Sequence, residues 1–223
     1  RTGDILWDHR GIDETAAVMH SVSPTIAGDD VLIPYSSGEL FALSIADGKE
    51  LWSDSLMQSK HTQASGLFSG IGGTPVVDNG IAFACGNNGL TTAINMALGQ
   101  RVWQQQVASL NTPWLAGDDL FLLTTDNVLV DFVKTTGKIR WVSQLDSYEN
   151  AKEKTKPITW RGPVLVSGRL LLVSSNGKLV SVAAVSGKIM ETKSIPGNII
   201  TKPVVAGGRL YLVSQDATLY SFQ

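Results

Sequence analysis

The chain has 223 residues, of which 43% are hydrophobic and 17% are charged, and its formal net charge is −2. This composition suits a folded protein with a sizeable core, and the scattering of both charge signs argues against nucleic-acid binding, which needs a clustered basic face. The apolar runs are too short to span a membrane, and a single cysteine, Cys85, excludes an intramolecular disulfide.

In chain order, a short β-rich segment at residues 2–8 is followed by five copies of one repeat. A proline starts each copy, and the copies cover about residues 23–53, 74–104, 112–142, 162–192 and 202–223. The chain begins inside a repeat, which predicts that its natural start lies further upstream. Regular internal repeats are the signature of modular architectures.

Turn-forming residues keep a constant spacing inside each copy. In the first copy, Gly28, Gly38 and Gly48 punctuate three β-rich runs, and Trp52 follows in the fourth. The other copies keep these positions, with Asn, Ser or Ala replacing some glycines. Such residues supply the positive φ that tight hairpin turns require, so each copy predicts a four-stranded antiparallel meander.

A helical interpretation fails, because only residues 148–156 are free of turn formers for long enough. The charges of that segment alternate in sign, which favours a solvated polar loop. A lone meander cannot cover both of its faces, so the copies must pack on one another, and radial packing gives a β-propeller. We therefore predict an all-β propeller, residues 1–223, with five blades of four antiparallel strands.

The number of blades in the complete ring has two solutions. Residues 2–8 could complete the last sheet and close a five-bladed ring, or they could be the outer strand of an adjacent blade in a larger ring. The start of the chain within a repeat favours the larger ring.

A tryptophan recurs after the third turn of the repeats. The functional interpretation is an aromatic platform for a carbohydrate or a flat cofactor, and the architectural one is a wedge between blades. Periodic residues are usually architectural, so we predict blade docking for Trp7, Trp52, Trp103 and Trp141. Glu191 takes the place of the tryptophan in the fourth copy.

No catalytic constellation stands out, and the sequence predicts neither a cofactor nor a metal site. His9, His20 and His61 lack the short spacings of metal ligands. Cys85 lies in a predicted strand without a positive neighbour, which favours a buried, unreactive thiol. The connectors between repeats differ in length and are expected on one face of the disc, where binding residues usually reside.

The pattern from Leu40 to Trp52, Leu-x-Ala-Leu-x-x-x-x-Gly-Lys-x-Leu-Trp, resembles the quinoprotein-type propeller repeat. One branch of that superfamily holds the pyrroloquinoline-quinone dehydrogenases and another the BamB family. The similarity to the BamB family is closer, and it rests on residues 74–80, 99–105, 202–205 and 219–222 and on the missing tryptophan at Glu191. Residues 34–40 are similar to alphaproteobacterial members of this family.

This resemblance implies a non-catalytic, lipid-anchored, eight-bladed scaffold on the periplasmic face of the outer membrane, which docks POTRA domains of the barrel-inserting subunit. The chain would then be its carboxy-terminal five-eighths, with the lipidated cysteine upstream of Arg1. The family's docking surface uses the connectors before two successive blades. The matching positions are Ala16, Val18, Met19, His20, Gly70 and Gly72.

The arginine and the paired carboxylates of the family's docking motif are absent at these positions. Docking here would therefore depend on apolar contacts and backbone hydrogen bonds, as in strand addition. Two alternatives stay open. A fragment of a quinone-dependent dehydrogenase would need a calcium site and adjacent cysteines, and one cysteine cannot make that pair; the other alternative is a general peptide- or glycan-binding propeller.

Overall fold

The computed structural model describes residues 2–12, 22–57, 70–87 and 89–223. The chain divides into two compact units, Arg1–Pro113 with Thr135–Gly137, and Trp114–Lys134 with Lys138–Gln223. Among the described residues, no helix is long and apolar enough to cross a membrane.

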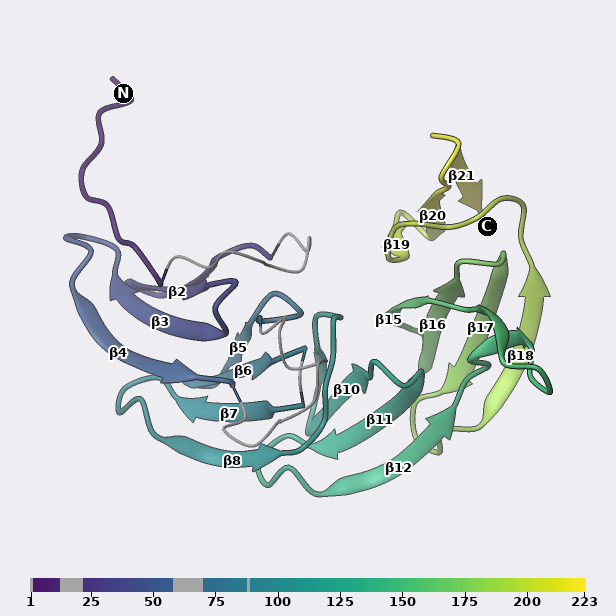
Figure 1. Ribbon diagram of the computed structural model, residues 1–223, viewed down its shortest axis with the longest axis horizontal. Helices are drawn as coiled ribbons and strands as arrows, with labels where there is room; N and C mark the ends of the chain where they lie inside the picture. Colours follow the sequence, from purple (N-terminus) through teal and green to yellow (C-terminus); the bar gives the residue numbers. More distant parts are fainter. Residues whose placement is uncertain (1, 13–21, 58–69, 88) are drawn as a thin grey trace. The chain divides into compact units, whose positions relative to one another are not determined.

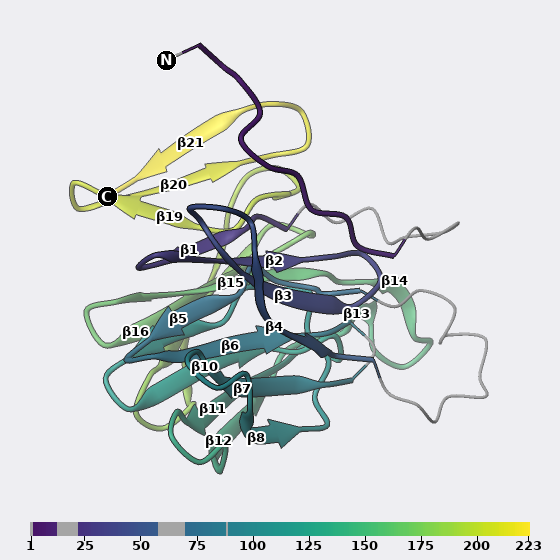
Figure 2. The same ribbon diagram turned by 90° about the vertical axis from the view of Figure 1, so that its left-hand side faces the viewer.

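The first unit contains two antiparallel meanders, in which each strand pairs with the next one along the chain (Figure 1). The first comprises β1 (Thr25–Ala27), β2 (Asp30–Pro34), β3 (Glu39–Ser44) and β4 (Glu50–Ser55). The second comprises β5 (Val76–Asp78), β6 (Ile81–Cys85), β7 (Thr91–Asn95) and β8 (Arg101–Gln105). In Figure 2 the second sheet lies below the first.

The second unit repeats the same arrangement. One sheet comprises β9 (Trp114–Ala116), β10 (Asp119–Leu123), β11 (Val128–Val133) and β12 (Ile139–Gln144), and the next comprises β15 (Trp160–Val166), β16 (Arg169–Ser174), β17 (Lys178–Ala183) and β18 (Ile189–Ser194). A three-stranded sheet follows, with β19 (Val204–Ala206), β20 (Arg209–Val213) and β21 (Leu219–Phe222). The predicted all-β class with four-stranded antiparallel sheets is confirmed.

Two segments differ from the sequence-based expectation. Residues 148–156, predicted as a polar loop, form most of a hairpin of β13 (Tyr148–Asn150) and β14 (Thr155–Pro157). Asn150 and Glu153 hydrogen-bond each other across its turn, so local turn chemistry forms the hairpin without an apolar face. Residues 2–8 pair with no strand in the described structure. A strand requires a hydrogen-bonded neighbour, so their role as the outer strand of an adjacent blade stays a prediction.

The core lies between successive sheets of each unit. In the first unit, Leu32 and Leu40 pack with Ala82 and Ile94 of the neighbouring sheet, and all four are fully buried. In the second, Phe121 and Leu129 pack with Leu170 and Val182 in the same way. The fourth strand of each complete sheet is mostly exposed, so the inner strands carry most of the apolar burial.

The Trp52 side chain on β4 packs on the β7–β8 turn of the second sheet. The Trp52 indole N–H donates to the Met96 carbonyl oxygen at 2.7 Å. Its side chain covers Gly99, whose φ is +66° and where an added Cβ would lie 2.5 Å from the Trp52 Cβ. Glycine is therefore required at this turn for two reasons, the left-handed backbone and the contact with the tryptophan.

The same contact recurs at each of the other tryptophans singled out by the repeat. The partners are Gly48 and the Ile45 carbonyl for Trp7, Gly137 for Trp103, and Gly187 and the Ala184 carbonyl for Trp141.

Candidate protein-binding surface

Antiparallel topology places three features at one end of the first sheet: the residues leading into β1, the β2–β3 turn and the residues leaving β4. The first connector, residues 8–24, precedes β1, and the second connector, residues 56–75, joins β4 to β5. The predicted partner-binding residues belong to these connectors. Ala16, Val18, Met19 and His20 lie outside the described residues.

The other two predicted positions, Gly70 and Gly72, have different surroundings. Gly70 is partly exposed, and its carbonyl accepts a hydrogen bond from the Asn87 amide at 2.9 Å. Gly72 is buried, its amide donates to the Cys85 carbonyl at 2.8 Å, and a Cβ atom there would overlap the Ser109 carbonyl oxygen. Within this pair, only Gly70 is accessible at the surface, because Gly72 is enclosed by its own unit.

The end of the second connector is added to the second sheet as a short bridge. Ile71, which is 4% exposed, pairs antiparallel with Gly86 just beyond β6. The hydrogen bonds that flank this bridge use the Gly70 carbonyl and the Gly72 amide. The backbone of the connector is therefore fixed where it reaches β5.

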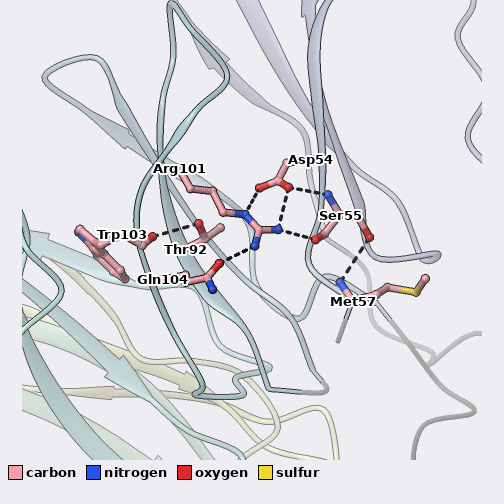
Figure 3. Close-up of polar contacts among 7 residues, drawn as sticks. All are labelled: Asp54, Ser55, Met57, Thr92, Arg101, Trp103 and Gln104. Carbon is pink, nitrogen blue, oxygen red and sulfur yellow. Dashed lines mark hydrogen bonds and ion pairs between the residues drawn. The ribbon is translucent and has the colours of Figure 1, made fainter. Parts of the chain in front are cut away.

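The start of the second connector is held by Arg101, which sequence reasoning did not single out. Figure 3 shows its guanidinium between β8 and the end of β4, where Nε and Nη2 donate to the two Asp54 carboxylate oxygens at 2.8 and 2.7 Å. Nη2 also donates to the Ser55 carbonyl at 2.7 Å, and Nη1 to Gln104 Oε1 at 2.6 Å. This two-pronged arrangement fixes orientation as well as distance.

Comparison of the repeats could have revealed this residue. The other copies carry Glu50, Ile139 and Ile189 at the position of Arg101. A basic residue at a position that is acidic or apolar in the other copies is a candidate for a contact present in one copy only. The Asp54 side chain is 16% exposed and the Arg101 side chain 32%, so we expect a stability contribution of about 1 kcal/mol from the pair.

The first connector is held by the β2–β3 turn. The Tyr35 hydroxyl donates to the His9 carbonyl at 3.0 Å, and the same oxygen lies 2.8 Å from His9 Nδ1. Because the hydroxyl has one proton, His9 Nδ1 must carry a hydrogen and donate to Tyr35. Burial, followed by the nearby Glu39 carboxylate, raises the pKa of Tyr35 and keeps the hydroxyl protonated. His9 thus has a structural partner in Tyr35.

Two ionisable side chains are buried within the sheets, the Cys85 thiol and the Asp131 carboxyl. Burial raises the pKa of the free Cys85 thiol to about 12, so the thiolate needed for nucleophilic chemistry does not form near neutral pH. Within the described part of the chain, no three or more His, Cys, Asp or Glu side chains gather as metal ligands. Asp131 on β11 is 1% exposed, and its Oδ1 has no hydrogen-bond partner among the residues that the structure describes.

Asp131 was also not singled out from the sequence. It lies opposite both Phe121 and Trp141 in the sheet, so it shares a face with two aromatic rings. Burial raises the pKa of Asp131 to about 7, the Asp119 carboxylate raises it further, and Arg140 partly opposes them. The repeat offered a signal, since the second and fourth copies carry Ala93 and Ser181 at this position.

Comparison with known proteins then assigns the chain to a family. The profile of the family described as "Outer membrane protein assembly factor BamB" matches residues 1–143 and 129–223. The chain belongs to the BamB family. The resemblance derived from the repeats is therefore confirmed, and it extends over the whole chain.

Individual relatives agree with this assignment. The outer membrane protein assembly factor BamB of Escherichia coli is 26% identical over 200 residues, which is 89% of this chain and 49% of the relative. The chain spans about half the length of the curated BamB relatives it matches.

Solved structures show the propeller fold. The crystal structure of BamB from Moraxella catarrhalis aligns with a TM-score of 0.82 and 19% identity, over 98% of this chain and 63% of that one. A europium-containing methanol dehydrogenase aligns with a TM-score of 0.58 and 15% identity, over 79% of this chain and 42% of that one. The fold is therefore more similar to a BamB protein than to this member of the dehydrogenase branch.

Proposed function

We propose that the protein is a non-catalytic scaffold of the outer-membrane β-barrel assembly machinery, which docks the POTRA domains of the barrel-inserting subunit. The proposal rests on the BamB-family match along the whole chain. It places the complete protein at the periplasmic face of the outer membrane, held there by a lipid anchor on a part of the protein upstream of this chain.

The two connectors are the proposed docking surface. Both leave the same end of the first sheet, and the described part of the second is fixed at both ends by Arg101 and by the Ile71–Gly86 bridge. Fixed backbone lowers the conformational entropy lost on binding. Met57 and Ile12 are 48% and 65% exposed, and apolar side chains of this kind suit the apolar centre of a protein interface.

Recovery of the barrel-inserting subunit tests the proposal. The full-length protein, used as bait in envelope extracts, is expected to retain that subunit. Gly70→Glu is expected to reduce recovery by roughly tenfold, because a charged side chain would project beside the Ser36 carbonyl, 3.1 Å from the Cβ position. Asp29→Lys is the matched control, since Asp29 is exposed in the β1–β2 turn at the other end of the sheet. Failure of the unsubstituted bait to recover the subunit would refute the docking proposal.

The dehydrogenase alternative makes a separate prediction. Pyrroloquinoline quinone added with Ca²⁺ would raise the melting temperature of a cofactor-binding enzyme, because a ligand that binds only the folded state stabilises it. We expect no change in melting temperature for this protein when scanning calorimetry is run with and without both additives. A saturable increase that depends on both additives would favour the enzyme.

A further inference from the structure

The β2–β3 turn, residues 35–39, touches both connectors. On one side the Tyr35 hydroxyl binds His9, and Gly11 lies directly on the Tyr35 ring, where an added Cβ would be 2.5 Å from Cδ1. The Glu39 carboxylate accepts a hydrogen bond from the Ile12 amide at 3.3 Å. The turn thus holds residues 9–12 at three successive points before the first connector continues.

On its other side the same turn holds both ends of the second connector. The Leu56 amide donates to the Gly38 carbonyl at 2.9 Å, and Leu56 is 1% exposed. A Cβ atom at Gly38 would lie 3.0 Å from Met57 Cγ and 3.8 Å from the Gly70 nitrogen. Residues 56–57 and Gly70, although separated in sequence, therefore meet at one turn.

The turn is itself rigidly built. The Tyr35 and Gly38 amides bond to the Glu39 and Tyr35 carbonyls at 2.9 and 3.0 Å, and the Ser37 hydroxyl donates to Glu39 Oε2 at 2.9 Å. Phe41 packs against the rings of Tyr35 and His9, with centroids 5.5 and 4.7 Å apart. Glu39 Oε2 is shared by Ser37 and the Ile12 amide, so one carboxylate joins the turn to the first connector.

We infer that Tyr35 and Glu39 are positioning residues for partner docking: the β2–β3 turn holds residues 9–12 of the first connector together with residues 56–57 and Gly70 of the second. This inference rests on the proposed function, because it requires that the connectors meet the partner. Tyr35 and Glu39 would then contribute to docking by fixing the connectors, without having to touch the partner. Removal of either anchor frees residues 9–12, and binding must then order them again at a cost in affinity.

Glu39→Ala tests the coupling in the protein alone. Hydrogen exchange of the Ile12 amide is expected to become about three- to tenfold faster, the change produced by losing one ordinary hydrogen bond. Glu39→Gln keeps an acceptor oxygen and is expected to restore slow exchange. Glu50→Ala on β4 is the matched control, since the Glu50 side chain binds only the nearby Ser53 hydroxyl in the described contacts. Unchanged Ile12 exchange in Glu39→Ala would overturn the inference.

Affinity for the purified barrel-inserting subunit provides the readout that a purely structural role would not change. Glu39→Ala and Tyr35→Phe are each expected to weaken the Kd of the full-length protein by about three- to tenfold, with an unchanged melting temperature and with rescue by Glu39→Gln. If the unsubstituted protein does not bind, the proposed function fails. If it binds and both variants match it, the positioning inference fails and the proposed function stands.

Discussion

Replacement of Trp52 by alanine is expected to lower the free energy of unfolding by about 2–4 kcal/mol. The change removes a large ring that is half-buried between the first two sheets, and truncation of core aromatic residues costs about 3–5 kcal/mol. It also leaves the Met96 carbonyl without the indole N–H, a loss of about 1 kcal/mol. Urea denaturation at constant slope measures the difference.

The partner glycine separates two contributions to this contact. Gly80 and Gly99 belong to turns of the same sheet and have φ values of +73° and +66°, but an added Cβ meets nothing within 4 Å at Gly80. Gly80→Ala should therefore lower the free energy of unfolding only by the penalty for a side chain in left-handed backbone, about 1 kcal/mol. Gly99→Ala should lower it further, because its Cβ also meets Trp52. In the Trp52→Ala background the two glycine substitutions should lower the free energy of unfolding by similar amounts. Equal effects of Gly80→Ala and Gly99→Ala in the native background would contradict a docking role for Trp52.

Asp131→Asn is expected to stabilise the protein at about pH 8 and to flatten the pH dependence of its stability. The folded-state pKa is raised to about 7, whereas an unfolded aspartate titrates near 3.9. Between these values the folded state binds more protons than the unfolded state, so the free energy of unfolding falls as pH rises. The stabilising contribution is complete below about pH 4 and is lost as pH passes through about 7.

The size of the effect follows from the shift. Three pKa units correspond to about 4 kcal/mol as an upper bound, and solvent screening together with relaxation around the site leaves on the order of 1–3 kcal/mol. Urea denaturation at about pH 5 and about pH 8 gives the difference between Asp131→Asn and the native protein. Asp118→Asn, at an exposed position in the β9–β10 turn, is the control. If Asp131→Asn kept the native dependence of stability on pH, Asp131 would not be the source of that dependence.

The two glycine positions that the family resemblance implies for docking differ in their surroundings. Gly70 and Gly72 were predicted together because a family motif places two residues at that spacing, yet one is at the surface and the other is enclosed by Ser109 and Cys85. Residues two apart in an extended strand point to the same side, so the spacing alone does not separate Gly70 from Gly72. The backbone around Ser109, which lies directly over Gly72, makes the difference.

The amino-acid sequence by itself determined the four-stranded sheets, their antiparallel order and the BamB-family assignment. These depend on local chemistry, since residues such as Gly38 and Gly99 set hairpin turns within a few positions and the strands between them alternate with a period of two. The tertiary structure alone decided the pairing of Arg101 with Asp54, 47 residues apart, and of Tyr35 with His9, 26 apart. It also decided the burial of Asp131. Such contacts form where separate sheets and connectors meet, and no repeat spacing encodes which side chains face one another there.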